Sequence, residues 1–356
     1  MEQPTHVIDP DGEVIIVLQN TDPQFAELDG NIQGVAEELN HPEEHMETPK
    51  PTLEEEPAVT EEPTETGVDA PQEEVCFRIQ VSAKHLTFAS PVFKNILTGG
   101  WKESVTYLQQ GSVEITAESW DIDALLILLR IIHCQYHHIP LKLTLEVLAK
   151  IAALAEYYNC RETVRFLGHI WISALEEPIP STDCRDLILW LWISWFFQLP
   201  SQFKEATSTA MSWGDNWIDN LGLPISDKVI KSMNDRRQEA ITNLVHRLHE
   251  KREELLSGSR GCGYECSSIM YGALTKQMQL NALLCPKPEV PFVDLNYRSL
   301  VQRVSSFISP HWDCDLSRHT QHWHLCDDSS FERIFGELSD TIEGLDLDGF
   351  IHGSTG

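Results

Sequence analysis

Two strand-like runs separated by a long acidic segment constrain the fold of this chain more than any other feature. The first run is Val14–Leu18 and the second is Val75–Val81. β-branched residues favour strands, and the Asp-Pro-Asp-Gly sequence at 9–12 is typical of a turn. Closing the intervening loop of about 55 residues costs roughly 2 kcal/mol more than closing a short one. Burying five large aliphatic side chains contributes roughly 7 kcal/mol, so we expect the two runs to pair.

The acidic charge is concentrated in the first 74 residues. The formal net charge is −29 over 356 residues, and residues 1–74 hold 21 Asp and Glu against one base, Lys50. The remaining 282 residues therefore carry only −9. Residues 21–74 are rich in Glu, Pro and Thr, which is the composition of a disordered insertion. We interpret them as a solvated spacer or, alternatively, as a phosphorylated or partner-binding segment.

The charge pattern also argues against direct nucleic-acid binding, because phosphate binding needs a face of Lys and Arg. One stretch between residues 236 and 254 carries basic residues interleaved with four glutamates, and its bases are Arg236, Arg237, Arg247, Lys251 and Arg252. We interpret this stretch as the solvated side of a helix rather than a binding patch.

No segment indicates a membrane span or a secretory signal. The most hydrophobic run, Leu187–Phe197, has 11 residues, whereas a membrane helix needs about 20. The first residues do not form a basic region followed by an apolar one, and the nine Cys are odd in number and scattered. We therefore expect an intracellular protein with reduced thiols, in the cytoplasm or the nucleus, with no membrane partner.

After the second run, the pattern predicts two short helices, a strand and then helices. Ala83–Gly100 is divided at Ser90-Pro91, because proline is favoured at the first position of a helix. Ser112–Thr116 alternates as a strand does, and Trp120–His133 is apolar almost all round, which predicts a buried helix. The other predicted helices are Thr144–Tyr158, Val164–Ala174, Asp183–Phe197, Gln202–Met211 and Ser226–Leu256, the last with Ser226 as its N-cap.

This order of elements, with the motifs between them, resembles a BTB/POZ domain. The matching residues are Val75–Val81, His85–Phe93, Trp101–Ser104, Val113–Thr116 and Leu125–Tyr136. Further along, Cys262–Gly272 and Gly344–Leu347 are similar to segments of a group of filamentous-fungal BTB proteins. The resemblance implies an α+β fold, with a BTB/POZ-like small sheet capped by helices, followed by a mostly α-helical C-terminal region.

The expected organisation has five parts. They are the first strand of the BTB-like domain at 1–20, the acidic insertion at 21–74, the remainder of that domain at 75–176, a helical region at 177–257, and a Cys/His-containing region at 258–356. The family's hairpin is interrupted here by the insertion. Little chain precedes Val14 to supply the extra N-terminal elements by which longer members dimerise, so homodimerisation by that route is not implied.

The resemblance implies that the chain acts as a scaffold or adaptor through protein–protein interaction. An alternative is a substrate adaptor of a cullin-type ubiquitin ligase, because Trp101 and Glu103 occupy the place of the hydrophobic-x-Glu element that contacts the cullin in such members. The other interpretation of these two residues is a core or rim aromatic and a solvated charge.

Cys and His residues near the end of the sequence suggest a structural zinc site. Zinc favours thiolate and imidazole ligands in tetrahedral sets, with paired ligands two to four residues apart. Cys262, Cys266, one of His322 and His324, and Cys326 would form a Cys3His set, in a stretch that also contains His311, Cys314 and His319. The alternative is ordinary thiols and surface histidines. With zinc, a nuclear zinc-dependent regulator becomes a third functional hypothesis.

Two further expectations concern these Cys/His residues. The segment around Cys262 and Cys266 has little apolar content that could form a core of its own, so we expect a metal to help order it. A weaker cluster combines Cys134 with His133, His137 and His138. We expect its members to pack rather than to bind metal.

The sequence contains no motif that indicates an enzyme. We find no phosphate-binding loop, no Gly-x-Ser-x-Gly and no His-Glu-x-x-His. The glycine-containing stretch at 258–261 lacks a preceding strand and a following Lys, so we interpret it as a loop. We therefore expect no catalytic residue and no cofactor other than the zinc ion.

Overall fold

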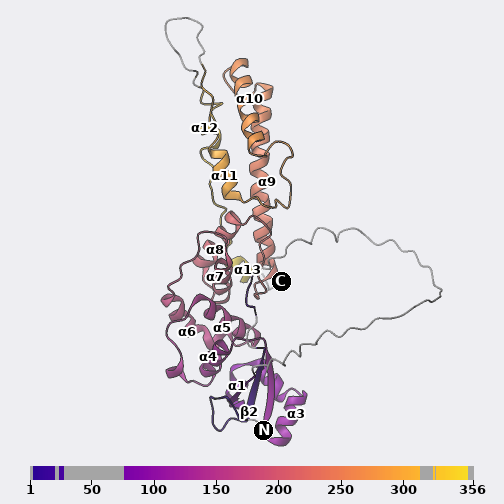
Figure 1. Ribbon diagram of the computed structural model, residues 1–356, viewed down its shortest axis with the longest axis vertical. Coiled ribbons are helices and arrows are strands. Elements are labelled where there is room, and N and C mark those ends of the chain that lie inside the picture. The colour runs from indigo at the N-terminus through magenta and orange to yellow at the C-terminus, as the bar shows by residue number, and fades with distance from the viewer. Residues whose placement is uncertain (1–2, 21–23, 28–75, 313–323, 325, 352–356) are drawn as a thin grey trace, which may run out of the picture.

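The computed structural model describes residues 3–20, 24–27, 76–312, 324 and 326–351. It is a mixed α/β structure in which a small sheet lies at one end and helices form the rest (Figure 1). The insertion expected at 21–74 falls outside the described residues except for 24–27. No helix of the described ranges is long and apolar enough to cross a membrane.

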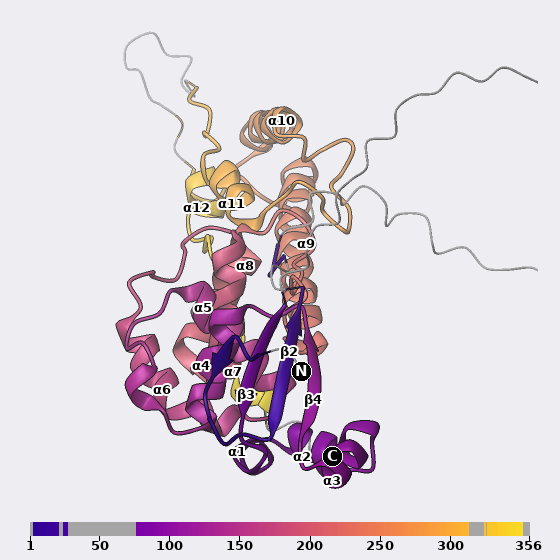
Figure 2. The ribbon, with the colours of Figure 1, turned by 60° about the horizontal axis from the view of Figure 1, so that its bottom comes forward.

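Four strands in the described residues form one sheet in the order β1-β3-β2-β4. They are β1 (His6–Val7), β2 (Val14–Gln19), β3 (Phe77–Val81) and β4 (Val113–Glu118). β2 is antiparallel to β3 and parallel to β4, and β1 is parallel to β3. The predicted pairing of Val14–Leu18 with the later run is therefore confirmed. Figure 2 shows the sheet with helices packed behind it.

The helices next to the sheet follow the predicted order, with one addition. They are α1 (Ala83–Ala89), α2 (Pro91–Thr98), α3 (Lys102–Gln110), α4 (Ile122–Ile132), the 3₁₀ turn η1 (Tyr136–His138), α5 (Leu145–Tyr157) and α6 (Arg161–Ala174). The hydroxyl of Ser90 accepts a hydrogen bond from the Phe93 amide and donates one to the Tyr158 carbonyl, which separates α1 from α2 as predicted. The addition is α3, which ends at Gly111 in a left-handed conformation.

The remaining helices extend away from the sheet (Figure 1). They are α7 (Arg185–Phe196), α8 (Pro200–Trp213), α9 (Asp227–Ser257), α10 (Tyr264–Leu280), α11 (Tyr297–Ser305), α12 (Phe331–Phe335) and α13 (Asp348–Ile351). Ser226 is the N-cap residue of α9 by position, but its side chain makes no capping hydrogen bond. Sequence periodicity predicted α7, α8 and α9 and missed the helices after them.

Buried apolar residues form two clusters that share α9. The first core combines the sheet with α1, α2 and α4–α8, and it includes the beginning of α9 up to Met233. The second core begins at Ile241 of α9 and includes α10, α11 and α12. The apolar packing is therefore continuous across residue 176, where a boundary was expected. The division between the first and the second core lies within α9.

The second core corrects the expectation that the segment around Cys262 and Cys266 has little core. Helix α10 presents Cys266, Met270, Leu274 and Met278 as a buried stripe against α9. A four-residue spacing places all of them on one helical face. Apolar burial therefore contributes to ordering this region, and a metal would add to it rather than replace it.

Two segments far apart in the sequence complete the first core. Arg185 of α7 donates hydrogen bonds to the carbonyl oxygens of Phe25 and Ala26, at 2.8 and 3.0 Å. Folded contacts therefore continue past the expected boundary at residue 20. Residues 342–347 return from the second core and bury Leu345 and Leu347 in the first.

Hydroxyl groups of α8 hold this returning segment. Ser212 accepts a hydrogen bond from the Ile342 amide and Thr207 accepts one from the Leu345 amide. Gly344 passes so close to α8 that a Cβ there would collide with the Lys204 carbonyl oxygen. The chain thus ties the second core back onto the first.

Arg237 is the clearest departure from the predicted pattern, because it is 1% exposed instead of solvated. Its guanidinium donates hydrogen bonds at 2.8–3.0 Å to the carbonyl oxygens of Gly214, Asp215, Phe292 and Leu295. Burial lowers the pKa of Arg237, and Asp215 opposes this shift. The side chain joins the loop after α8 to the loop before α11.

His133 is buried in the first core and does not belong to a metal cluster of the described residues. Its Nδ1 lies 2.7 Å from the Leu129 carbonyl oxygen, and its Nε2 accepts a hydrogen bond from the Ser82 amide at 3.0 Å. The ring is therefore neutral, with its proton on Nδ1. Desolvation lowers the pKa of His133, and the stacked ring of His85 acts in the same direction.

Replacing Arg237 with Met should lower the free energy of unfolding by about 3 kcal/mol, because four buried carbonyl oxygens lose their donor. Arg237→Lys should recover only part of this loss, since one ammonium group cannot reach two loops at once. The neighbouring exposed Arg236 gives the control, and Arg236→Met should stay within about 0.5 kcal/mol of the wild type in urea unfolding. Equal effects at the two positions would contradict the role of Arg237.

Lowering the pH below about 6.5, the ordinary pKa of histidine, should destabilise the protein through His133. Its folded-state pKa is depressed, so the unfolded chain takes up a proton first and stability falls as the pH falls. Urea unfolding at pH 7.5 and 5.5 should show a smaller difference for His133→Gln than for the wild type. The exposed His137 serves as control, because His137→Gln should keep the wild-type pH dependence.

Candidate metal centre and partner-binding surface

Four sulfur and nitrogen donors from two distant segments meet at one end of the second core. Cys262 and Cys266 lie at the start of α10, whereas His324 and Cys326 lie before α12. Their ligand atoms are all within 4.8 Å of one another. The sulfur of Cys262 is 3.6 Å from Nε2 of His324. The structure thus brings together the predicted Cys262, Cys266 and Cys326 with His324, whereas His322 lies outside the described residues.

The loop between α9 and α10 is shaped so that both cysteines can reach the cluster. Gly258 ends α9 at φ +76°, and Gly261 has φ +99°, conformations that favour glycine. Asp328 accepts a hydrogen bond from the Gly261 amide at 2.7 Å, and Arg260 pairs with both Asp328 and Glu254. Polar contacts therefore tie this loop to the segment that carries Cys326, independently of any metal.

Neighbouring side chains also orient His324 and Cys266. The ring of His324 stacks on Trp312 at a centroid distance of 4.2 Å, and its amide donates to the Trp312 carbonyl oxygen. The sulfur of Cys266 lies 3.2 Å from the hydroxyl oxygen of the buried Ser329. Such outer contacts fix the direction of a ligand before it binds.

The thiols of the cluster differ in acidity. Desolvation raises the pKa of Cys262 to about 11, and the neighbouring Cys266 and Cys326 add to the shift. Desolvation acts on Cys326 as well, but hydrogen bonds from the hydroxyl and amide of Ser329 outweigh it and lower its pKa. The pKa shifts of Cys262 and Cys326 therefore have opposite directions. The cluster could hold a metal ion.

The other Cys and His residues of the predicted stretch are His311, Cys314, His319 and His322. Cys314, His319 and His322 lie outside the described residues. His311 is described and is not part of the cluster. Glu332 helps to position the segment, because it accepts hydrogen bonds from the hydroxyls of Ser309 and Ser330. These bonds hold its pKa at about 2 although desolvation opposes the shift.

The predicted partner-binding residues lie on α3 but do not share one surface. Trp101, the N-cap residue of α3, is 63% exposed, which excludes a core position. Val105 and Leu108 follow on the same helical face and are 45% and 78% exposed. We call Trp101, Val105 and Leu108 the α3 stripe. Val105 and Leu108 were not predicted as binding residues, although their spacing of four and three from Trp101 is the signal of one helical face.

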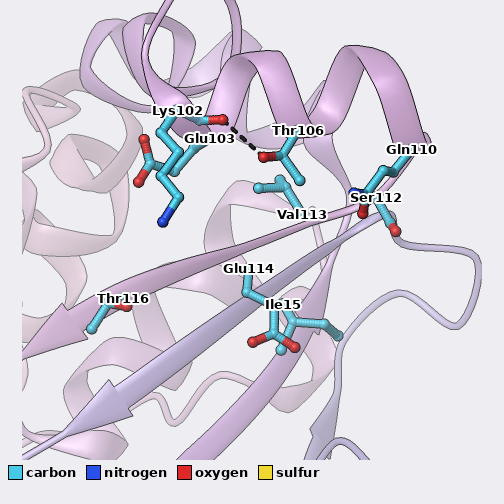
Figure 3. Close-up of a pocket in the computed structure, with 9 residues that line it drawn as sticks. All are labelled: Ile15, Lys102, Glu103, Thr106, Gln110, Ser112, Val113, Glu114 and Thr116. Atoms are coloured by element: carbon cyan, nitrogen blue, oxygen red, sulfur yellow. Dashed lines mark hydrogen bonds between the residues drawn. The ribbon is translucent and has the colours of Figure 1, made fainter. Parts of the chain in front are cut away.

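Glu103 points to a groove between α3 and the outer face of the sheet (Figure 3). The groove has a volume of about 390 Å³, and its polar wall on α3 consists of Lys102, Glu103, Thr106 and Gln110. Its floor includes Ile15 of β2 together with Glu114 and Thr116 of β4. Helix α3 therefore presents two surfaces, the apolar stripe and the polar groove.

Comparisons with known proteins give no further information on identity. No family model, curated protein or solved structure matches the chain.

Proposed function

We propose that this chain is a protein-interaction module of the BTB/POZ type, acting as a scaffold or adaptor and not as an enzyme. The order of strands and helices supports the proposal, because β2, β3, α1, α2, β4, α4, α5 and α6 follow one another as the resemblance implies.

The α3 stripe carries the proposal. A nine-residue helix that exposes Trp101, Val105 and Leu108 leaves a continuous apolar face without cover in the described structure. Exposed apolar patches of this kind mark protein-binding surfaces, and Trp is prominent among residues that dominate binding energy. The partner that fits such a face is a protein with an apolar groove or helix.

A substrate adaptor of a cullin-type ubiquitin ligase is the more specific alternative. The resemblance places the cullin contact at Trp101 and Glu103, and both lie at the first turn of α3. A partner that uses both residues must cover the end of the helix, from the α3 stripe to the rim of the groove. A partner that uses the stripe alone does not depend on Glu103.

The cluster at Cys262, Cys266, His324 and Cys326 is best suited to a structural zinc ion. Tetrahedral zinc with Zn–S of about 2.3 Å and Zn–N of about 2.0–2.1 Å places sulfur and nitrogen ligands about 3.6 Å apart, which equals the Cys262–His324 separation. Three thiolates and one imidazole form a closed set that fills all four positions. The zinc would fasten the segment before α12 to the start of α10. A zinc ion at this cluster would also favour a further alternative, in which the chain is a nuclear zinc-dependent regulator.

Trp101→Ala with Leu108→Ala should abolish partner binding without unfolding the chain, because both side chains are exposed. Affinity purification with mass spectrometry should recover a set of partner proteins with the wild type. The recovered amount of these proteins should fall at least about tenfold with the double variant, which is the loss expected when hot-spot residues are truncated. Phe166, 77% exposed on α6, gives the control, and Phe166→Ala should retain the set. The circular dichroism spectrum of all variants should match the wild type.

The same experiment separates the two partner hypotheses. If a cullin is among the proteins lost, and Glu103→Ala alone also loses it, the adaptor alternative holds. If no cullin binds the wild type, that alternative fails, while the scaffold proposal still depends on the stripe. Retention of every partner by the double variant would overturn the proposal itself.

Protein purified without added metal should contain about one zinc per chain by elemental analysis. Cys266→Ser should remove it and speed hydrogen exchange at the start of α10 and before α12, because metal binding in the folded state adds to stability. Cys285, a free exposed thiol outside the cluster, gives the control, and Cys285→Ser should keep the zinc. A content below about a tenth of an equivalent would show that the four residues are ordinary thiols and imidazole.

A further inference from the structure

One edge of the sheet has backbone groups that no strand of the described residues pairs with. β4 is the last strand in the order and pairs only with β2 among the described strands. The amides at positions 113 and 119 donate to the carbonyl oxygens of Glu13 and Gln19, both on the β2 side. Because backbone groups alternate along a strand, those of Glu114, Thr116 and Glu118 point away from β2.

This edge is open and long enough for another strand. Glu114, Thr116 and Glu118 are exposed, whereas the alternate residues Val113 and Ile115 are buried. Figure 2 shows β4 at the margin of the sheet with no other strand beside it. The six residues of β4 match the usual length of a strand, whereas the opposite edge is the two-residue β1.

The groove lies beside the same edge. Its floor is formed partly by Glu114 and Thr116, and its wall is formed by α3. In an added strand, alternate side chains would point to this side of the sheet, where the groove has room for them. We propose that the free edge of β4 is a docking site for an extended, basic segment of a partner protein, which adds to the sheet as a fifth strand.

The charge around the edge selects the occupant. The groove is lined by two acidic residues, Glu103 and Glu114, and one basic residue, Lys102. A third carboxylate, Glu118, is exposed at the end of β4. Arg78 pairs with Glu114, while Glu103 and Glu118 form no ion pair within the described residues. Lys or Arg at every second position of the added strand would complement these carboxylates.

A second copy of the chain does not fit this edge. If two β4 strands paired antiparallel about Thr116, Glu114 of each would lie opposite Glu118 of the other. Like charges in directly opposed positions destabilise a strand pair. Carboxylates at these positions therefore discourage self-pairing, as charged residues do on other edge strands, and leave the edge to a basic partner.

This docking site is separate from the α3 stripe on which the proposed function rests. The stripe faces away from the groove, and its side chains Val105 and Leu108 do not line it. Trp101→Ala with Leu108→Ala should therefore leave binding at β4 unchanged. Failure of one proposal can be told from failure of the other.

A fluorescent peptide with the sequence Val-Lys-Val-Lys-Val-Lys-Val is the direct probe, used with the full chain in anisotropy titrations. The peptide should bind saturably. Thr116→Pro should lower its affinity about tenfold or more, because proline removes an outward amide and blocks the edge. Proline is tolerated on an edge strand where the amide faces solvent, so the β2–β4 pairing should persist. Thr116→Val keeps the amide and should bind as the wild type does.

Two peptide controls test the mode of binding even if Thr116→Pro fails to fold. Methylating the backbone nitrogens of the three Lys residues, or of three Val residues instead, preserves all charges but removes alternate amides. One of these peptides should bind like the parent and the other should not, since only one set faces β4. Equal behaviour of the two, or absence of binding by the parent peptide, would overturn strand addition.

The charge requirement has its own test. Glu103→Lys with Glu118→Lys should weaken binding of the Lys peptide and should favour binding of the peptide Val-Glu-Val-Glu-Val-Glu-Val instead. Both positions are at the surface of the site, so circular dichroism should remain native. An unchanged preference for the Lys peptide would overturn the basic occupant.

Discussion

The arrangement of the two cores depends on one buried guanidinium. Arg237 lies on α9 between Met233, the last residue that this helix contributes to the first core, and Ile241, the first that it contributes to the second. It binds carbonyl groups of the loop after α8 and of the loop before α11. A buried charge without acceptors is costly, so each loop must stay in place to satisfy it. This requirement acts together with the continuous helix α9 and the returning segment 342–347, which also join the two cores.

The sequence predicted most elements of the first core and few beyond α9, for physical reasons that differ from place to place. Val14–Leu18 was placed correctly because burial outweighs the entropy of a long loop. Arg237 was misplaced because a basic residue beside Arg236 and among glutamates has the pattern of a solvated face, and its acceptors lie in loops about 20 and 55 residues away. Helix α3 was missed because it is short, and its C-terminal signal is the single Gly111.

The candidate metal ligands were predicted from the sequence as a set, with the choice between His322 and His324 left open. Spacing pointed to the pair Cys262 and Cys266. In the structure the packing of α12 on the second core, with the contacts of Asp328 to the α9–α10 loop, brings His324 and Cys326 beside them. The expectation of a weak local core was wrong, since the Met and Leu residues of α10 repeat every four positions. That error changes what a metal ion would do at this cluster. It would reinforce a region that packing already orders, and it would fasten two loops whose ends are far apart in the sequence.

The two surfaces of α3 follow from how that helix is stabilised. A helix of nine residues is too short to be stable alone, so its inward contacts must hold it. Ser104 is buried and donates to the Trp101 carbonyl oxygen, Tyr107 packs against the first core, and Gly111 closes the C-terminus. None of these contacts uses a side chain of the α3 stripe or of the groove wall. Both surfaces can therefore serve binding without a cost to folding, and substitutions on either one test partners rather than stability.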